Sequence, residues 1–192
     1  MVKKRQNYIS WNTYFMANAI MASFRSKDPS TINGACVVDP KTNTIISSGY
    51  NGFVRGCSDD VFPWKREGDN TKYPYVECAE RNAIYNAHRD LEGAEMYLYS
   101  EKGYLPCCHC ARGIIQTGIK KVFVLFKILD KIDKWDFSQS IKMFNAAGVT
   151  IEDLSLNEDF FKHFECFFNR IEEFKTVFKN IYLRDVSQAA LV

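Results

Sequence analysis

The sequence predicts an α/β domain in which helices flank a β-sheet. Segments rich in β-branched and aromatic residues alternate with segments in which apolar residues recur every three or four positions. The chain has 192 residues, of which 46% are hydrophobic and 25% charged, so it is long enough to bury one substantial core. Its formal net charge of +2 gives no electrostatic reason to expect a nucleic-acid ligand.

The first helix is predicted between residues 10 and 26. Ser10 is a suitable N-cap, because its hydroxyl can accept a hydrogen bond from a free N–H of the first turn. The helix should end before Asp28-Pro29. Apolar residues at helical spacing are expected to pack in the core, namely Trp11, Tyr14, Phe15, Ala19 and Ala22.

The middle of the chain continues the alternation. Strands at 34–39 and 44–50 are predicted to form a hairpin around the turn residues 39–43. Asp136 is the expected cap of a later helix, and Gly148 its C-terminal stop. The other elements are helices at 78–87, 107–117 and 136–146 and strands at 94–99, 121–126 and 149–151.

A long helix is predicted from Asn157 onward. We expect a domain at 1–153 and a helical extension at 154–192, packed either on its own domain or at a subunit interface. The extension carries an aromatic stripe at helical spacing, formed by Phe160, Phe161, Phe164, Phe167, Phe168, Ile171, Phe174 and Phe178.

Two short segments predict a metal centre: Cys78-Ala79-Glu80-Arg81 and Pro106-Cys107-Cys108-His109-Cys110. A catalytic zinc takes three protein ligands and keeps its fourth position for water. Cys78, Cys107 and Cys110 can supply three thiolates. Glu80 follows the first ligand by two residues, where a carboxylate can shuttle protons beside the metal without binding it.

Two other interpretations of these cysteines remain open. A structural zinc site normally has four ligands, and Cys108 or His109 would then be the fourth. A disulfide is the second alternative. Glu80 favours the catalytic interpretation, because a structural site has no use for a carboxylate at that position.

Several motifs together resemble the zinc-dependent cytidine and deoxycytidylate (dCMP) deaminases. Besides C-A-E and P-C-x-x-C, the resemblance rests on R-S-K-D-P-S at 25–30, G-Y-N-G at 49–52, G-C-S-D-D at 56–60 and K-Y-P-Y-V at 72–76. These motifs occur in the family's order over about residues 10 to 150. Their combination is far more specific than any one of them.

The resemblance implies a three-layer α/β/α sandwich with a central mixed five-stranded sheet, and a zinc hydrolase that converts dCMP to dUMP and ammonia. It implies that Asn51 and the backbone N–H of Ala79 contact the nucleoside. Arg25 and Lys27 are the best-placed cations for the 5′-phosphate, and the alternative is that they bind an effector. Many members of the family are homohexamers that are activated by dCTP with Mg²⁺ and inhibited by dTTP.

One residue departs from the deoxycytidylate deaminase pattern. Cys78 stands where most of these enzymes carry histidine, whereas free cytidine deaminases commonly have C-A-E-R, as here. A third thiolate leaves the zinc site with a net charge of −1, which acidifies bound water less. We expect Arg81, or else Arg112, to offset this charge.

The sequence leaves open other substrates for a deaminase and one class of protein without catalytic activity. The alternatives are deamination of dCTP, a free nucleoside, a riboflavin precursor or adenosine in tRNA, and a non-catalytic zinc-binding module. The seven cysteines show no disulfide framework, the N-terminus has no signal-peptide core, and no apolar segment is long enough to span a bilayer. We therefore expect a cytoplasmic protein with neither a membrane nor a nucleic-acid partner, and the family resemblance implies that it is a homo-oligomer.

Overall fold

A mixed five-stranded sheet forms the centre of the fold. The computed structural model describes residues 2–125 and 137–189, and only the backbone from residue 179 onward. The sheet has the order β2-β1-β5-β6-β7. Strand β1 pairs antiparallel with both of its neighbours, and β5, β6 and β7 are parallel. The strands are β1 (Asn33–Asp39), β2 (Thr44–Tyr50), β5 (Glu95–Ser100), β6 (Lys121–Val124) and β7 (Thr150–Asp153).

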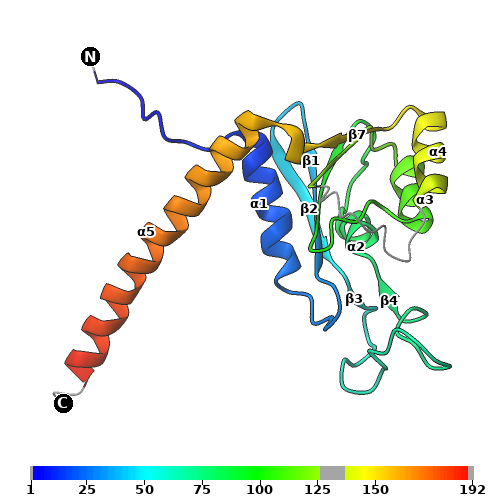
Figure 1. Cartoon of the computed structure of the whole chain (residues 1–192), viewed down its shortest axis with the longest axis horizontal. Coiled ribbons are helices and arrows are strands. Elements are labelled where there is room, and N and C mark those ends of the chain that lie inside the picture. The colour runs from blue at the N-terminus through cyan, green and yellow to red at the C-terminus, as the bar shows by residue number, and fades with distance from the viewer. Residues whose placement is uncertain (1, 126–136, 190–192) are drawn as a thin grey trace.

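Helices cover both faces of this sheet, as Figure 1 shows. On one face lie α1 (Trp11–Ser23) and the beginning of α5 (Glu158–Ala189), which follows the short 3-10 helix η1 (Leu154–Leu156). The other face is covered by α2 (Ala79–Asn86), α3 (Cys108–Gln116) and α4 (Ser138–Ala147). The α/β/α sandwich with a mixed five-stranded sheet is therefore confirmed.

Two buried clusters result from the alternation of side chains along the strands. Ala35 and Val37 of β1 face α2, α3 and α4, whereas Cys36 and Val38 face α1. Burial raises the pKa of the Cys36 thiol to about 12, so this cysteine is an inert core residue.

The first helix differs from its predicted core face. Phe15 and Ala19 are buried, but Trp11 is 56% exposed and Tyr14 is 40% exposed. The expectation that these two residues pack in the core was wrong. Met16 packs against the sheet instead, because the face of the helix that contacts β1 is rotated away from Trp11 and Tyr14. The helix also ends at Ser23, earlier than predicted.

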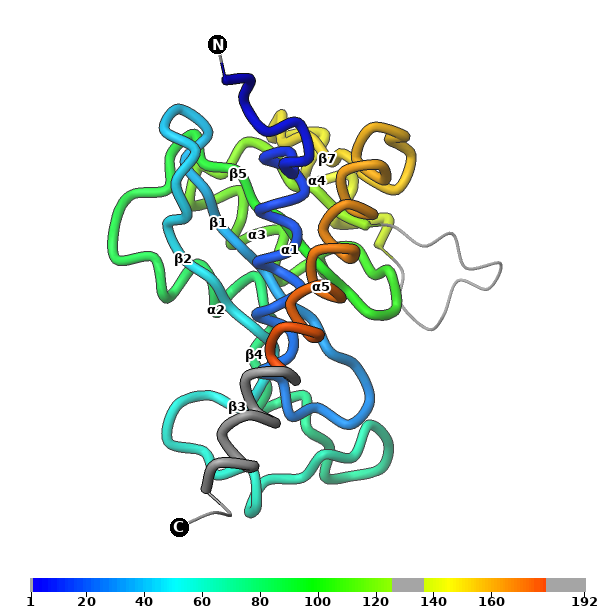
Figure 2. Tube along the Cα trace, turned by 90° about the vertical axis from the view of Figure 1, so that its left-hand side faces the viewer, coloured from blue at the N-terminus to red at the C-terminus, as the bar shows by residue number. Residues whose placement is uncertain are grey.

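A small second sheet was missed in the sequence. Strands β3 (Gly52–Phe53) and β4 (Val76–Glu77) pair antiparallel and close the loop between them. Each has two residues, too few for a period-2 pattern to be recognised. The loop forms a lobe at one end of the molecule in Figure 2, where the ring centroids of Trp64 and Phe53 are 4.3 Å apart.

The remaining predicted boundaries agree with the structure within a few residues. Gly148 ends α4 with φ of 69°, as predicted, because glycine adopts this left-handed conformation without strain. Asp136 and Phe126 lie outside the described residues. Among the residues that the structure describes, no helix is both long and apolar enough to cross a bilayer.

Candidate active site

The two cysteine segments meet at the beginnings of two helices. Cys78 is the N-cap of α2, Cys107 is the N-cap of α3, and Cys110 lies in the first turn of α3. Their three sulfur atoms all lie within 4.8 Å of one another. The free N–H groups and the positive dipole end of each helix favour thiolates here. The structure thus brings together the three ligands predicted from the sequence.

The thiols also influence one another. The pKa of Cys107 is lowered, mainly because its thiolate accepts hydrogen bonds from Cys110 and Cys78. The pKa values of Cys78 and Cys110 are raised well above the ordinary value, first of all by their hydrogen bonds to Cys107. One thiolate therefore forms easily, whereas three thiolates together require a cation. The donor set fits a zinc ion, which is bound by thiolates in a tetrahedral arrangement.

The two candidates for a fourth ligand have other partners. The Cys108 sulfur lies 3.6 Å from Oε1 of Gln139, and Nδ1 of His109 lies 2.9 Å from Nη2 of Arg112. Among the described residues, the group of side chains able to hold a metal has three members. The arrangement therefore favours a catalytic site with an open position over a closed structural site.

Glu80 is the buried acid of this site. It lies in the first turn of α2, beside the thiols, and is 5% exposed. Burial, and next the negative charge of Cys107, raises the pKa of Glu80 to about 7. A carboxyl with this pKa can both accept and release a proton near neutral pH, which is what a proton shuttle requires.

Close contacts with β2 hold α2 in place. A Cβ atom at Gly49 would lie 2.3 Å from the Ala83 nitrogen and 2.4 Å from the Ala79 oxygen. The Ser47 hydroxyl donates a buried 2.7 Å hydrogen bond to the Ala83 carbonyl, and the Asn82 side chain donates to the Tyr50 carbonyl. Gly49 therefore lets the sheet closely approach the helix that carries Glu80.

Asn51 lies in a buried network close to residues 25–31. Its Oδ1 accepts from the Asn33 N–H at 2.8 Å, and its Nδ2 donates to the Thr31 carbonyl at 3.0 Å and to Asp28 at 3.3 Å. Asp28 in turn pairs with Lys72, and both side chains are at most 5% exposed. Asp28 and Lys72 belong to the quoted motifs but were not predicted as site residues, because burial cannot be inferred from a polar motif alone.

The two cations predicted to contact phosphate lie in this same region. Lys27 pairs with Asp59, while 57% of its side chain stays exposed. The Arg25 guanidinium lies 5.8 Å from the centroid of the Tyr50 ring. Because Lys27 and Asp59 come from different motifs, their ion pair joins two loops that are far apart in sequence.

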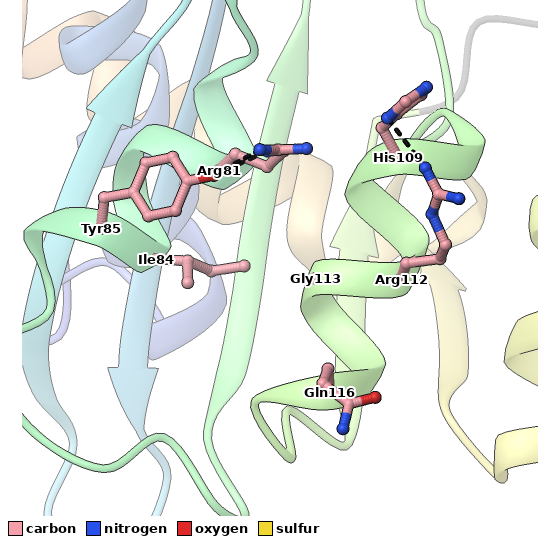
Figure 3. Close-up of a pocket in the computed structure, with 7 residues that line it drawn as sticks. All are labelled: Arg81, Ile84, Tyr85, His109, Arg112, Gly113 and Gln116. Atoms are coloured by element: carbon pink, nitrogen blue, oxygen red, sulfur yellow. Dashed lines mark hydrogen bonds between the residues drawn. The ribbon is translucent and has the colours of Figure 1, made fainter.

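A groove lies between α2 and α3, the two helices at whose beginnings the thiols meet (Figure 3). It encloses about 310 Å³. Arg81 donates to the Tyr85 hydroxyl and pairs with Glu77 at 3.1 Å. Partial burial lowers the pKa of Arg81, but the hydroxyl of Tyr85 and the charges of Glu77 and Cys110 outweigh it and raise that pKa. The groove is lined by Arg81, Ile84, Tyr85, His109, Arg112, Gly113 and Gln116.

The chain is similar to several known proteins. Residues 9–126 match the family described as the cytidine and deoxycytidylate deaminase zinc-binding region. The human deoxycytidylate deaminase is 46% identical over 153 residues, which cover 77% of this chain and 82% of the human one. A probable deoxycytidylate deaminase of Drosophila melanogaster is 43% identical and is covered to 73%.

A solved structure shares the fold. The dCMP deaminase of cyanophage S-TIM5, in complex with dCMP and dUMP, superimposes with a TM-score of 0.55 at 24% sequence identity. The match covers 73% of this chain and 93% of the phage chain. With the three cysteines and Glu80 placed as described, the chain belongs to the cytidine and deoxycytidylate deaminase family.

Proposed function

We propose that the protein is a zinc-dependent hydrolase that converts dCMP to dUMP and ammonia and thereby supplies the precursor of thymidylate. The observation that carries the proposal is the buried Glu80 beside three clustered thiols, with a pKa raised to about 7. The curated deoxycytidylate deaminases at 46% identity support dCMP as the substrate.

Glu80 moves the protons of this reaction. Cys78, Cys107 and Cys110 would hold a zinc ion that acidifies its bound water, although less than a zinc site with neutral ligands does, because three thiolates leave a net charge of −1. Glu80 accepts a proton from the attacking water and delivers it to N3 of the base, while the water oxygen bonds to C4. Glu80 then carries the second proton of this water to the amino group, and the C4–N bond breaks. Ammonia leaves, and Glu80 ends as the carboxylate with which it began.

Other residues would bind and orient the substrate. Ala79 is the first residue of α2, so its N–H has no acceptor within the helix and can donate to the pyrimidine carbonyl. Asn51 is assigned to the nucleoside, and Arg25 and Lys27 to the 5′-phosphate. The burial of Asn51 and its hydrogen bonds support a role in holding this loop in a fixed position for the substrate.

We infer the regulation and assembly of the protein from the family resemblance. We expect a cytoplasmic homohexamer that is activated by dCTP with Mg²⁺ and inhibited by dTTP. The effector site would use the loops at 25–31 and 50–64. The Lys27–Asp59 pair and the hydrogen bond from the Ser26 hydroxyl to the Asn51 carbonyl join these loops, which supports their acting as one unit.

Deamination of free cytidine or deoxycytidine is the second candidate. The specific observation in its favour is the run Cys78-Ala79-Glu80-Arg81, which is common in enzymes that act on the nucleoside. Acceptance of dCTP would require additional space beyond the α-phosphate. Both alternatives keep the same chemistry at Glu80 and change only the recognition of the phosphate.

The test measures ammonia release from dCMP, dCTP, deoxycytidine and cytidine, each with and without dCTP or dTTP plus Mg²⁺. We expect dCMP to be turned over fastest, and Glu80→Ala to abolish turnover while zinc remains bound. A preference for a nucleoside would instead favour the second candidate. Absence of turnover for all four substrates in the zinc-loaded protein would contradict the proposed function.

A separate test concerns the charge of the zinc site. Arg81 is proposed to offset the third thiolate from the groove side, and the Cys110 charge acting on its guanidinium supports this role. We expect Arg81→Ala to weaken zinc binding and to lower kcat by about tenfold, by loss of a charge-supporting contact near the ligands. Arg112→Ala is the comparison, and an equal effect would mean that the two share the role. Unchanged zinc affinity and turnover in Arg81→Ala would contradict it.

A further inference from the structure

A buried ion pair lies beside Asn51, outside the groups that the proposed reaction uses. It joins Asp28 and Lys72, whose side chains are 1% and 5% exposed. Aspartate and lysine are almost never buried this fully unless they are paired, because it is costly to remove either charge from water. The two residues are 44 positions apart, so the pair connects segment 25–31 with the segment that leads into β4.

The carboxylate of Asp28 organises the turn that follows it. Its Oδ1 accepts hydrogen bonds from the N–H groups of Ser30 at 2.9 Å and Thr31 at 3.3 Å, which closes an Asx turn. The carbonyl of Thr31 then accepts from Nδ2 of Asn51 at 3.0 Å. The same nitrogen donates to Oδ2 of Asp28 at 3.3 Å. Asp28 therefore holds the Asn51 amide both directly and through the turn.

The orientation of the Asn51 amide decides what it can offer to a substrate. The Asn33 N–H is a donor, so the amide atom 2.8 Å from it must be the oxygen. The Thr31 carbonyl is an acceptor, so the atom that faces it must be the nitrogen. Both hydrogens of this nitrogen have acceptors, whereas the oxygen keeps a second lone pair. In this orientation Asn51 can offer a nucleoside an acceptor but not a donor.

Lys72 compensates the buried charge of Asp28 from a fixed position. Its carbonyl accepts from the N–H groups of Tyr75 at 2.9 Å and Val76 at 3.1 Å, so its main chain belongs to a closed turn next to β4. A buried carboxylate without its cation carries an uncompensated charge. Such a charge would be drawn toward water, and the turn and Asn51 would move with it.

We propose that Asp28 and Lys72 are positioning residues for substrate binding, and that they act through Asn51. This role rests on the proposed function, in which Asn51 contacts the nucleoside. Glu80 is held separately, by the close approach of α2 to Gly49. Loss of the pair should therefore weaken substrate binding and raise KM, while kcat of the folded, zinc-loaded protein changes little.

Two neutral pairs test this role without leaving a charge buried. Asp28→Asn with Lys72→Met keeps an oxygen that can close the turn, whereas Asp28→Leu with Lys72→Met has a side chain of similar size without one. For ammonia release from dCMP, we expect the second variant to have a KM about tenfold or more above that of the first, with kcat values within about threefold of each other. The Kd of the product dUMP, measured by calorimetry, should follow KM. Zinc content and far-UV circular dichroism verify that each variant is folded.

A double-mutant cycle shows whether the pair acts through Asn51. Asn51→Ala should raise KM by itself. Adding Asp28→Leu with Lys72→Met should then raise KM by less than about twofold more, because the two changes remove the same contact. Lys121→Met is the control for loss of an ion pair elsewhere, since Lys121 pairs with Glu152 in the neighbouring strand, and it should leave KM unchanged.

The results separate this role from the proposed function. Equal KM values for the two neutral pairs, effects that add to that of Asn51→Ala, or a fall in kcat without a rise in KM would overturn the positioning role in a protein that still deaminates dCMP. If the wild-type protein prefers a nucleoside, the same comparison is made with that nucleoside. A zinc-loaded wild-type protein that turns over none of these substrates would contradict the proposed function, and the positioning role with it.

Discussion

Glu80, which we propose as the proton shuttle, also makes folding stability depend on pH. Its pKa is about 7 in the folded chain, whereas an exposed glutamate ionises near 4.5. Between these values the unfolded chain has lost the proton that the folded chain still holds. Folding stability therefore falls as pH rises from 4.5 through 7, and the loss persists above 7.

Replacement of this carboxyl should stabilise the metal-free protein at high pH. For Glu80→Gln we expect a gain of up to about 3 kcal/mol at pH 8, which shrinks toward pH 5, together with loss of turnover. Urea unfolding of chelator-treated protein at pH 5, 6.5 and 8 measures the gain. Glu77→Gln is the control, since that neighbouring acid pairs with Arg81 and should not stabilise the protein when replaced. A gain that does not vary with pH would contradict the argument.

Among the structural elements, α2 depends on the glycine beneath it. The 2.3 Å distance from a Cβ atom at Gly49 to the Ala83 nitrogen involves backbone, which cannot move aside as a flexible side chain can. Any residue larger than glycine must therefore displace the helix that carries Cys78, Ala79 and Glu80.

Gly49→Ala should therefore impair catalysis, although Gly49 itself is not one of the proposed catalytic residues. We expect a loss of about 1–3 kcal/mol of stability and a fall in kcat of about tenfold or more, because a displaced Glu80 no longer meets the reacting atoms. Gly52→Ala is the matched control, since its added Cβ would meet nothing nearer than the Tyr50 ring at 3.7 Å. Thermal melting and ammonia release measure both variants, and equal effects would refute the role of the close approach.

In the whole molecule, the cysteine cluster proposed to bind zinc joins parts of the chain that are distant in sequence. Cys78 begins α2, whereas Cys107 and Cys110 belong to α3, with strand β5 between them. A metal that binds only the folded arrangement stabilises it by mass action, by about 4 kcal/mol at a thousandfold excess over its Kd.

Chelation should therefore lower the melting temperature of the whole domain by roughly 10 °C, as expected for a chain of this length. Differential scanning calorimetry before and after removal of the metal measures the change. Added zinc should restore the original value, and Mg²⁺ should not, because thiolates bind zinc and not this hard cation. A melting temperature insensitive to chelation would mean that the three cysteines hold no stabilising metal.

The sequence alone determined the order of the main elements, the three cysteines that cluster as proposed metal ligands, and the position of Glu80 beside them. These follow from local rules, since periodicity, helix caps and ligand spacing each extend over only a few residues. Helical periodicity failed where the answer depended on contacts outside the helix. Trp11 and Tyr14 fit a helical apolar face but stay exposed, because only packing decides which face meets the sheet.

The tertiary structure alone decided which distant residues meet. It placed Gly49 under α2, paired Lys72 with Asp28 out of solvent, and left more than half of the Phe174 and Phe178 side chains of α5 exposed. None of these follows from spacing along the chain, because each depends on how far two elements diverge or how closely they approach in space. The residues proposed for the chemistry were thus encoded locally. The contacts that hold them in place, and the exposure of the phenylalanines of α5, are consequences of the fold.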